Sequence, residues 1–302
     1  MSQWVRKGLA TGIKTTRYPA REEKAPGVSP GLPVGGEYPE AQARELVGLC
    51  PTGALSLADH QVAVDYRRCV HCFRCRYSAS APIGWQEGYE WAAASVVTAG
   101  ASPASEPDVP PGATNARLAA TLGSSGVCPG GKTPPSPAGE TPAATWHALG
   151  SPFSRSIHIL VVDAGDCGAC LNEVRHLNNP YYNMHRLGFF ITPTPREADV
   201  LLVVGPVTDH MRVPLQKAYD AMPTPKRVIA AGACALSGSV FGPSFVCGSS
   251  VRDLLPVDVE VPGQPPPPLA ILHGLLVAVS RRPSASLVSL AKNLNAEEVK
   301  AL

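Results

Sequence analysis

The sequence predicts an α+β domain followed by an α/β domain with a parallel sheet, separated by a linker. About 44% of the 302 residues are apolar, which is enough for a substantial core. In the second half of the chain, apolar runs alternate with helical patterns, as in parallel sheets that are covered on both faces. The 32 prolines and 28 glycines are unevenly spread, which indicates a linker between folded parts.

The second half contains the clearest elements. The predicted buried strands are 156–165, 198–207, 226–235 and a more polar 256–263, and the predicted helices are 213–222 and 268–279. The last helix is too short to span a bilayer and contains His273, so we expect it to be buried in the protein.

Composition sets the predicted boundaries at 1–92, 93–153 and 154–302. The middle range is rich in Ala, Pro, Gly, Ser and Thr and buries too little apolar surface to offset its ordering entropy. Cys128 lies in it and is expected to be a bystander thiol rather than a ligand. The formal net charge is +2 with no basic run, so we expect no nucleic-acid partner.

The nine cysteines are clustered, and the first residues lack the apolar run of a secretory signal. These features favour metal ligation in the reducing cytoplasm over a disulfide framework. Three cysteines form C-x-x-C-x-x-C at Cys69, Cys72 and Cys75, and Cys50-Pro51 precedes them. In two-cluster ferredoxins, such a triplet is completed by the Cys-Pro of the other half. We therefore predict a ferredoxin-like domain whose Cys50, Cys69, Cys72 and Cys75 hold one 4Fe–4S cluster.

The other ligand set of such a fold is missing as a whole. Its positions carry Glu40, Ala43, Leu46 and Ala79. Residues 54–68 alternate in polarity as a β-hairpin would, between the two cysteine segments. A structural zinc site is the alternative for the four thiolates, although the triplet spacing is unusual for zinc.

A second cysteine group follows the predicted strands of the α/β domain. Cys167 and Cys170 follow the first strand, and Cys234 ends the third. Loops at the carboxyl ends of parallel strands converge, so the three thiols are expected to meet at one sheet edge. The alternatives are a buried core thiol at Cys234 and a redox dithiol at the C-x-x-C pair.

At this point the sequence resembles a known family. GDCGACLNEV (165–174), PREADVLLVVGPVTDHM (195–211), AMPTPKRVIAAGACALSG (221–238) and LPVDVEVPGQPPPP (255–268) are similar to the small subunit shared by respiratory complex I and group 4 membrane-bound nickel–iron hydrogenases, the formate hydrogenlyase type above all. KTTRYP (14–19) and the first cysteine group resemble the ferredoxin-like subunit beside it. The chain thus resembles a fusion of the two.

The resemblance implies a flavodoxin-like fold for 154–302 and a proximal cluster on Cys167, Cys170 and Cys234. The fourth family ligand lies in G-C-P-P, and this chain has Gln264 at that position. The expected alternatives are an oxygen ligand from Gln264, a three-iron cluster on three thiolates, and an empty site. A fourth thiolate ligand from Cys247 is a weaker alternative.

The resemblance also implies a role and partners. The expected function is electron transfer between the clusters and a large catalytic subunit, in an oxidoreductase anchored by membrane-arm subunits at the inner face of the cell membrane. A non-catalytic scaffold is the alternative. Glu173 matches an acidic position of the family and is expected either to relay protons as a catalytic residue or to stabilise a helix N-terminus. Asp166 is expected to be a cap or turn residue.

Overall fold

A computed structural model of the chain describes residues 3–24, 30–58, 61–78, 82–95, 156–242 and 244–285. Ala79, Cys128 and nearly all of the predicted linker lie outside the described residues. No helix among those ranges is both long and apolar enough to cross a membrane.

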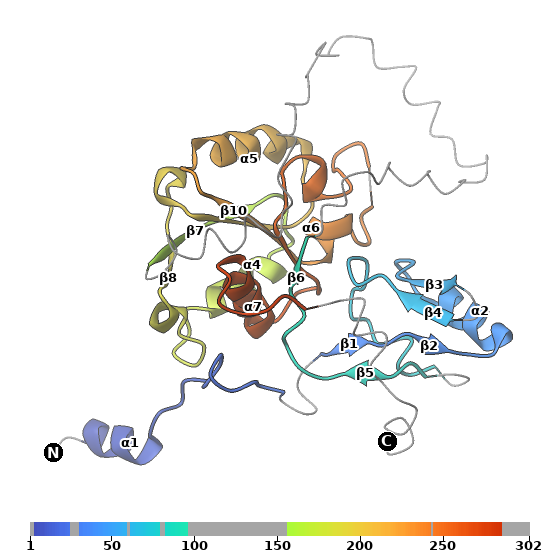
Figure 1. Ribbon diagram of the computed structural model, residues 1–302, viewed down its shortest axis with the longest axis horizontal. Helices are drawn as coiled ribbons and strands as arrows, with labels where there is room; N and C mark the ends of the chain where they lie inside the picture. Colours follow the sequence, from blue (N-terminus) through green and yellow to red (C-terminus); the bar gives the residue numbers. More distant parts are fainter. Residues whose placement is uncertain are drawn as a thin grey trace, which may run out of the picture. The chain divides into compact units, whose positions relative to one another are not determined.

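The α/β part is built on a six-stranded sheet in the order β6-β11-β10-β9-β7-β8 (Figure 1). Its strands are β6 (Ala93–Ala94), β7 (Ile157–Asp163), β8 (Phe189–Ile191), β9 (Val200–Val204), β10 (Arg227–Ala231) and β11 (Val259–Val261). All neighbours pair in parallel except β6, which is antiparallel to β11. If the five parallel strands are numbered 1 to 5 by their order in the sequence, their order across the sheet is 2-1-3-4-5. This is the order of flavodoxin-type doubly wound sheets.

Helices cover both faces of this sheet, which explains its nearly continuous apolar strands. Helix α5 (Asp209–Ala221) lies on one face (Figure 1). Its Leu215 belongs to the same buried cluster as Leu201 and Val203 of β9. Helices α4 (Ala169–His176) and α7 (Pro268–Ala278) lie on the other face (Figure 1). Every residue of α7 is buried, so the predicted buried helix is confirmed.

The four predicted strands are all present, in shorter form than expected. The fourth strand was expected to be more polar than the others, but all three residues of β11 are buried, including Glu260. The helix predicted at 213–222 begins earlier, at Asp209, and accommodates Pro214 in its interior. Strands β6 and β8 were not predicted. The remaining helical elements here are α6 (Ala233–Ser237) and three short 3-10 helices, Met184–Leu187, Pro195–Glu197 and Val251–Asp253.

The N-terminal part is α+β, as predicted. Its elements are α1 (Gln3–Thr11), β1 (Leu32–Pro33), β2 (Gly36–Glu37), α2 (Glu40–Leu49), β3 (Leu55–Ala58), β4 (Gln61–Val64) and β5 (Trp85–Gln86). Strands β3 and β4 pair antiparallel, so the predicted hairpin is confirmed, and β2 extends the sheet. Strands β1 and β5 form a separate antiparallel pair. The ferredoxin-like class of this part stays a prediction.

Helix α2 occupies the segment where a second cluster's cysteines would stand. Ala43 and Leu46 are fully buried and pack with Leu55, Val62 and Ile83. These two positions therefore belong to the apolar core of the N-terminal part, and the exposed Glu40 begins the helix and pairs with Arg44.

The end of the N-terminal part is joined to the α/β sheet. Strand β6 pairs with β11, and the Ser95 N–H donates to the Asp258 carbonyl at 2.8 Å. The Trp91 indole N–H donates to the Pro262 carbonyl at 3.0 Å. Residues 93–95, at the start of the predicted linker, thus belong to the edge of the sheet.

Candidate functional site

The four cysteines of the first group line one cavity. Cys50 is the C-cap of α2, and Cys69, Cys72 and Cys75 lie on the loop between β4 and β5. Most other lining residues are apolar: Pro33, Ala54, Leu55, Val64, Val70, Phe73 and Trp85. The structure therefore brings together the four thiols that the sequence analysis assigned to one cluster.

The loop 69–75 has an unusual backbone that suits a bound anionic group. His71 and Phe73 both adopt positive φ angles, 51° and 60°, whereas Cys72 between them does not. A left-handed conformation costs a non-glycine residue about 1–2 kcal/mol. Alternation of this kind turns successive N–H groups toward one side, as in the concave backbone sites of phosphates and Fe–S clusters. The His71 N–H bonds to the Cys69 sulfur in this way.

Backbone donors also converge on Cys50. The Ala54 N–H donates to the Cys50 sulfur at 3.2 Å, and the Thr52 hydroxyl lies 3.7 Å from that sulfur. Burial opposes ionisation of this thiol, but hydrogen bonds from Thr52, Ala54 and Leu55 outweigh burial and lower the pKa of Cys50. The site is thus prepared for negative charge on this sulfur.

The deeper thiols behave differently. Burial raises the pKa of Cys69 to about 12, with nearby cysteines adding to the effect. Burial, and then the charge of Cys72, also raise the pKa of Cys75. Thiols in such surroundings stay protonated unless a cationic group replaces the protons. The cavity therefore favours thiolates only when a positive centre lies between them.

An aromatic cluster that the sequence analysis missed adjoins this site, since Trp85 lines the cavity and His71 lies between Cys69 and Cys72 in the sequence. The His71 ring is 8% exposed, and it meets Trp85 and Trp91 edge to face at centroid distances of 5.9 and 5.8 Å. Burial lowers the pKa of His71 to about 4, so the ring is neutral at pH 7. Neither ring nitrogen has a hydrogen-bond partner in the part of the chain that the structure describes. Only the position of His71 inside C-x-x-C hinted at this role.

The second cysteine group lies at the carboxyl edge of the large sheet. Cys167 and Cys170 follow β7, Cys234 lies in α6 after β10, and Gln264 follows β11. Cys170 and Cys234 are buried and Cys167 is exposed. Burial raises the pKa of Cys170 and of Cys234, and the charges of the neighbouring cysteines add to both shifts. The structure thus places the three cysteines near one another at this edge, and their role as ligands stays a prediction.

A glycine permits the close approach of these loops. Gly232, between β10 and α6, has a φ of +97°, and a Cβ there would lie 2.7 Å from the Cys170 sulfur. The same Cβ would lie 3.7 Å from the Gly263 carbonyl oxygen. Cys170 therefore packs on the Gly232 backbone, beside the turn that carries Gln264.

Gln264 is held at this site through Ser239. The Ser239 hydroxyl lies within hydrogen-bond reach of both the Gln264 amide oxygen and the Cys234 sulfur, and its one proton is donated to either of them at a time. Donation to Cys234 partly offsets the effect of burial on that thiol's pKa. The amide oxygen of Gln264 is thus linked to Cys234 through one side chain. Gln264 is the residue that the family resemblance aligns with the fourth cysteine ligand.

Other predicted residues lie in simpler settings. Cys247 is buried and contacts the Gly242 carbonyl at 3.3 Å and the Ser244 hydroxyl at 3.2 Å, so its thiol is satisfied locally. Asp166 accepts the N–H groups of Gly168 and Leu171 at 3.1 and 3.0 Å, which confirms the turn and cap role.

Glu173 is the fifth residue of α4, outside its first turn, so the helix N-terminus interpretation is wrong. Its Oε2 lies 4.0 Å from the Nδ1 of His176.

No group of three or more His, Cys, Asp or Glu side chains within the described ranges is arranged to hold a single metal ion.

Comparison with known proteins places the α/β part in a family. Residues 167–278 match the family described as NADH ubiquinone oxidoreductase, 20 Kd subunit. An uncharacterized protein of Methanocaldococcus jannaschii is 44% identical over 122 residues, which cover 40% of this chain and 82% of that protein.

Two further relatives carry functional names. A probable membrane-bound hydrogenase subunit of Pyrococcus furiosus is 42% identical over 43% of this chain and 77% of its own length. Formate hydrogenlyase subunit 7 of Escherichia coli is 36% identical over 46% of this chain and 55% of its own length, so the match spans about half of that protein. By these matches, the chain belongs to the family of the 20 Kd subunit of NADH ubiquinone oxidoreductase.

Proposed function

We propose that this chain is an electron-transfer iron–sulfur subunit of a membrane-associated oxidoreductase of the hydrogenase or complex I type. It would pass electrons between a 4Fe–4S cluster held by Cys50, Cys69, Cys72 and Cys75 and a large catalytic subunit. The observation that carries the proposal is the single cavity lined by these four thiols. Such a cluster supplies a one-electron carrier whose potential the protein sets through hydrogen bonds and burial.

The residues of the first site fit such a cluster. The N–H groups of Ala54 and His71 bond to sulfurs of Cys50 and Cys69, and such bonds are among the means by which proteins set cluster potentials. The apolar side chains that line the cavity place the buried Cys69 in surroundings of low polarity. The four thiolates of a 4Fe–4S cluster bind four different iron atoms, so they lie farther apart than the ligands of one metal ion. The four thiols of the first site therefore need not surround a single point.

The second site fits only in part. Cys167, Cys170 and Cys234 supply three thiolates, and the Gln264 oxygen, which keeps a second lone pair beside the Ser239 bond, stands at the fourth position. We propose that this site holds an iron–sulfur cluster through the three thiolates. The proton-relay role of Glu173 stays a prediction.

The names of the relatives support the partners. Proteins named as subunits of a membrane-bound hydrogenase and of formate hydrogenlyase share the family. We therefore propose a large catalytic subunit and membrane-arm subunits as partners, and a peripheral position at the inner face of the cell membrane.

A non-catalytic scaffold is the second candidate function. The observation that favours it is the glutamine at position 264, which leaves the proximal site one thiolate short. In that case the chain would keep its docking surfaces without a complete electron path.

Metal and sulfide analysis of the anaerobically purified chain tests these proposals. We expect about eight irons per chain for two four-iron clusters, about seven with a three-iron second cluster, and about four with the first site alone, each with matching sulfide. The four-iron result would favour the scaffold.

A pair of cysteine variants sharpens the test. Cys72→Ser should remove about four irons, because it deletes one ligand of the first site. Cys247→Ser should remove none, since its thiol is satisfied locally. A colourless wild-type chain without sulfide would contradict the proposal, and stoichiometric zinc in its place would indicate a zinc site.

A further inference from the structure

Glu260 is a buried carboxylate in β11, next to the edge strand β6 of the large sheet. It is 2% exposed and lies in β11, where its strand neighbours are Ala230 of β10 and Ala93 of β6. Small side chains at both neighbouring positions leave room for larger groups beside it. A buried carboxylate is costly unless cations or hydrogen bonds compensate it, so its partners are informative.

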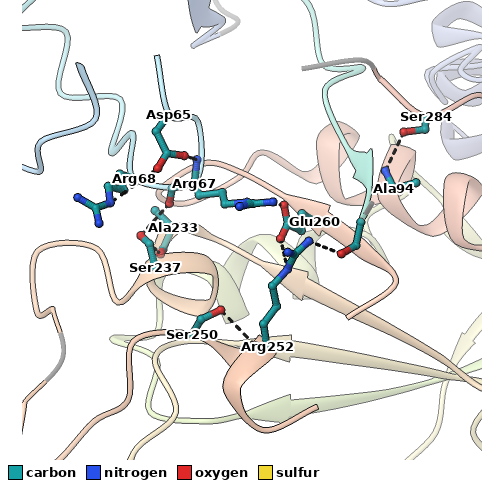
Figure 2. Close-up of polar contacts among 11 residues, drawn as sticks. Asp65, Arg67, Arg68, Ala94, Ala233, Ser237, Ser250, Arg252, Glu260 and Ser284 are labelled. Atoms are coloured by element: carbon teal, nitrogen blue, oxygen red, sulfur yellow. Dashed lines mark hydrogen bonds and ion pairs between the residues drawn. The ribbon is translucent and has the colours of Figure 1, made fainter. Parts of the chain in front are cut away.

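Its two oxygens bind two arginines from distant segments (Figure 2). The Arg67 Nε donates to one oxygen at 2.8 Å. The Arg252 Nε lies 2.6 Å from the other as an ion pair, although its N–H does not point at that oxygen. Arg252 also donates to the Ser95 hydroxyl, at the end of the N-terminal part.

Arg67 connects the two cysteine groups. It lies two residues before Cys69, and its carbonyl oxygen accepts the Ser237 hydroxyl at 2.9 Å (Figure 2). Ser237 is three residues after Cys234, in the same short helix. The main chain and the side chain of Arg67 are thus both held by the α/β part, one at the Cys234 helix and one at β11.

We propose that Glu260 is a positioning residue that, through Arg67, holds the loop of Cys69, Cys72 and Cys75 against the Cys234 site. This inference rests on the proposed function, since both sites must carry clusters for the spacing to matter. Rates of electron transfer fall steeply with distance, so loss of this contact slows transfer between the sites. A second link supports the same spacing: Trp91 contacts His71 of the cysteine loop, and its indole N–H donates to the Pro262 carbonyl after β11.

Arg67→Met tests the proposal with a matched control. Arg67 is 45% exposed in its side chain, so its replacement is tolerated better than that of buried Glu260. Arg68→Met is the control, because Arg68 directly precedes Cys69 in the sequence but makes a long ion pair within the N-terminal part. Its Nε lies 3.7 Å from an Asp65 carboxylate oxygen. Arg67→Lys keeps the positive charge, so it should retain part of the wild-type interaction between the two clusters. Glu260→Gln, which keeps the shape, is the second variant.

The readouts are iron and sulfide content and the magnetic interaction between the two clusters in the fully reduced, full-length chain, measured by EPR. We expect unchanged iron in all arginine variants. The interaction should be at least halved and intercluster transfer at least tenfold slower in Arg67→Met. Arg68→Met should match the wild type, and Arg67→Lys should lie between.

An Arg67→Met chain with wild-type interaction and transfer rate would overturn the positioning role. The positioning role would also be overturned by a wild-type chain that binds iron at one site only, or whose two clusters do not interact. In both cases the proposal of a first cluster would still stand. A wild-type chain without iron and sulfide would remove the proposed function and this inference together.

Discussion

Single residues decide what each cysteine site can hold. At the first site, Ala43 and Leu46 take positions where ligands of a second cluster would stand, and they instead fill the core under α2. At the second site, Gln264 takes the place of a thiolate but keeps its oxygen at the site through Ser239. Ala43 and Leu46 are thus held by apolar packing, and Gln264 by a polar contact.

Gln264→Cys should complete the second site. A fourth thiolate gives a four-iron cluster all of its usual ligands, so the iron content should rise by about one if the wild-type site holds a three-iron cluster. The EPR signal of an oxidised three-iron cluster should disappear at the same time.

Gln264→Ala, which removes the amide without adding a thiol, is the control and should keep that signal. If the wild type shows the three-iron signal, an unchanged iron content in Gln264→Cys would show that position 264 does not face the cluster.

Among the elements, the junction of β10 and α6 sets the geometry of the second site. Both residues of the turn are constrained: Gly232 has a φ of +97°, and its N–H donates to the Val261 carbonyl of β11 at 2.8 Å. The next N–H, of Ala233, donates to the Gly263 carbonyl at 2.8 Å. These bonds place Cys234 beside the turn that carries Gln264.

Gly232→Ala should displace Cys170, because the new Cβ would lie 2.7 Å from its sulfur. We expect loss of iron from the second site and a destabilisation of roughly 1–2 kcal/mol from the left-handed backbone. Metal analysis and urea unfolding measure the two effects.

Gly168→Ala separates strain from contact. Gly168 has a similar φ of +93°, but a Cβ there meets nothing within 4 Å. It should also lose stability, through its left-handed backbone with ψ −12° (against ψ 147° at Gly232), with the iron retained. Equal iron loss in both variants would refute the steric explanation.

At the scale of the whole molecule, a buried histidine joins segments that are far apart in sequence. The His273 Nδ1 accepts the Ala92 N–H at 3.1 Å, and its Nε2 contacts the Pro283 carbonyl at 3.3 Å. Burial lowers the pKa of His273 to about 4 from its ordinary 6.5, so the folded protein holds it neutral.

This histidine should make stability depend on pH. Its folded-state pKa lies below its unfolded one, so its contribution is complete above pH about 6.5 and is lost as the pH falls toward 4. Between pH 7 and 5 we expect His273 to account for a loss of roughly 2 kcal/mol in the free energy of unfolding.

His273→Gln should reduce this loss, and His210→Gln, at an exposed site on α5, should not. Urea unfolding at both pH values provides the measurement. An identical pH dependence in the wild type and His273→Gln would contradict the assignment.

The sequence by itself determined the parts that depend on local chemistry. Runs such as Val200–Val204 and the helix Pro268–Ala278 are apolar enough to be predicted as buried elements, and cysteine spacing selected the thiols that meet in each site. These features depend on near neighbours in the chain, or on the general rule that parallel strands end at one edge.

Only the tertiary structure decided how the two cysteine groups are joined. Arg67 and Glu260 are 193 residues apart, and Trp91 and Pro262 are 171 apart. Neither pair has a sequence pattern, because a contact between distant segments leaves no periodicity in either one. Strand β6 was missed for the same reason, since two alanines become a strand only when β11 supplies their hydrogen-bond partners.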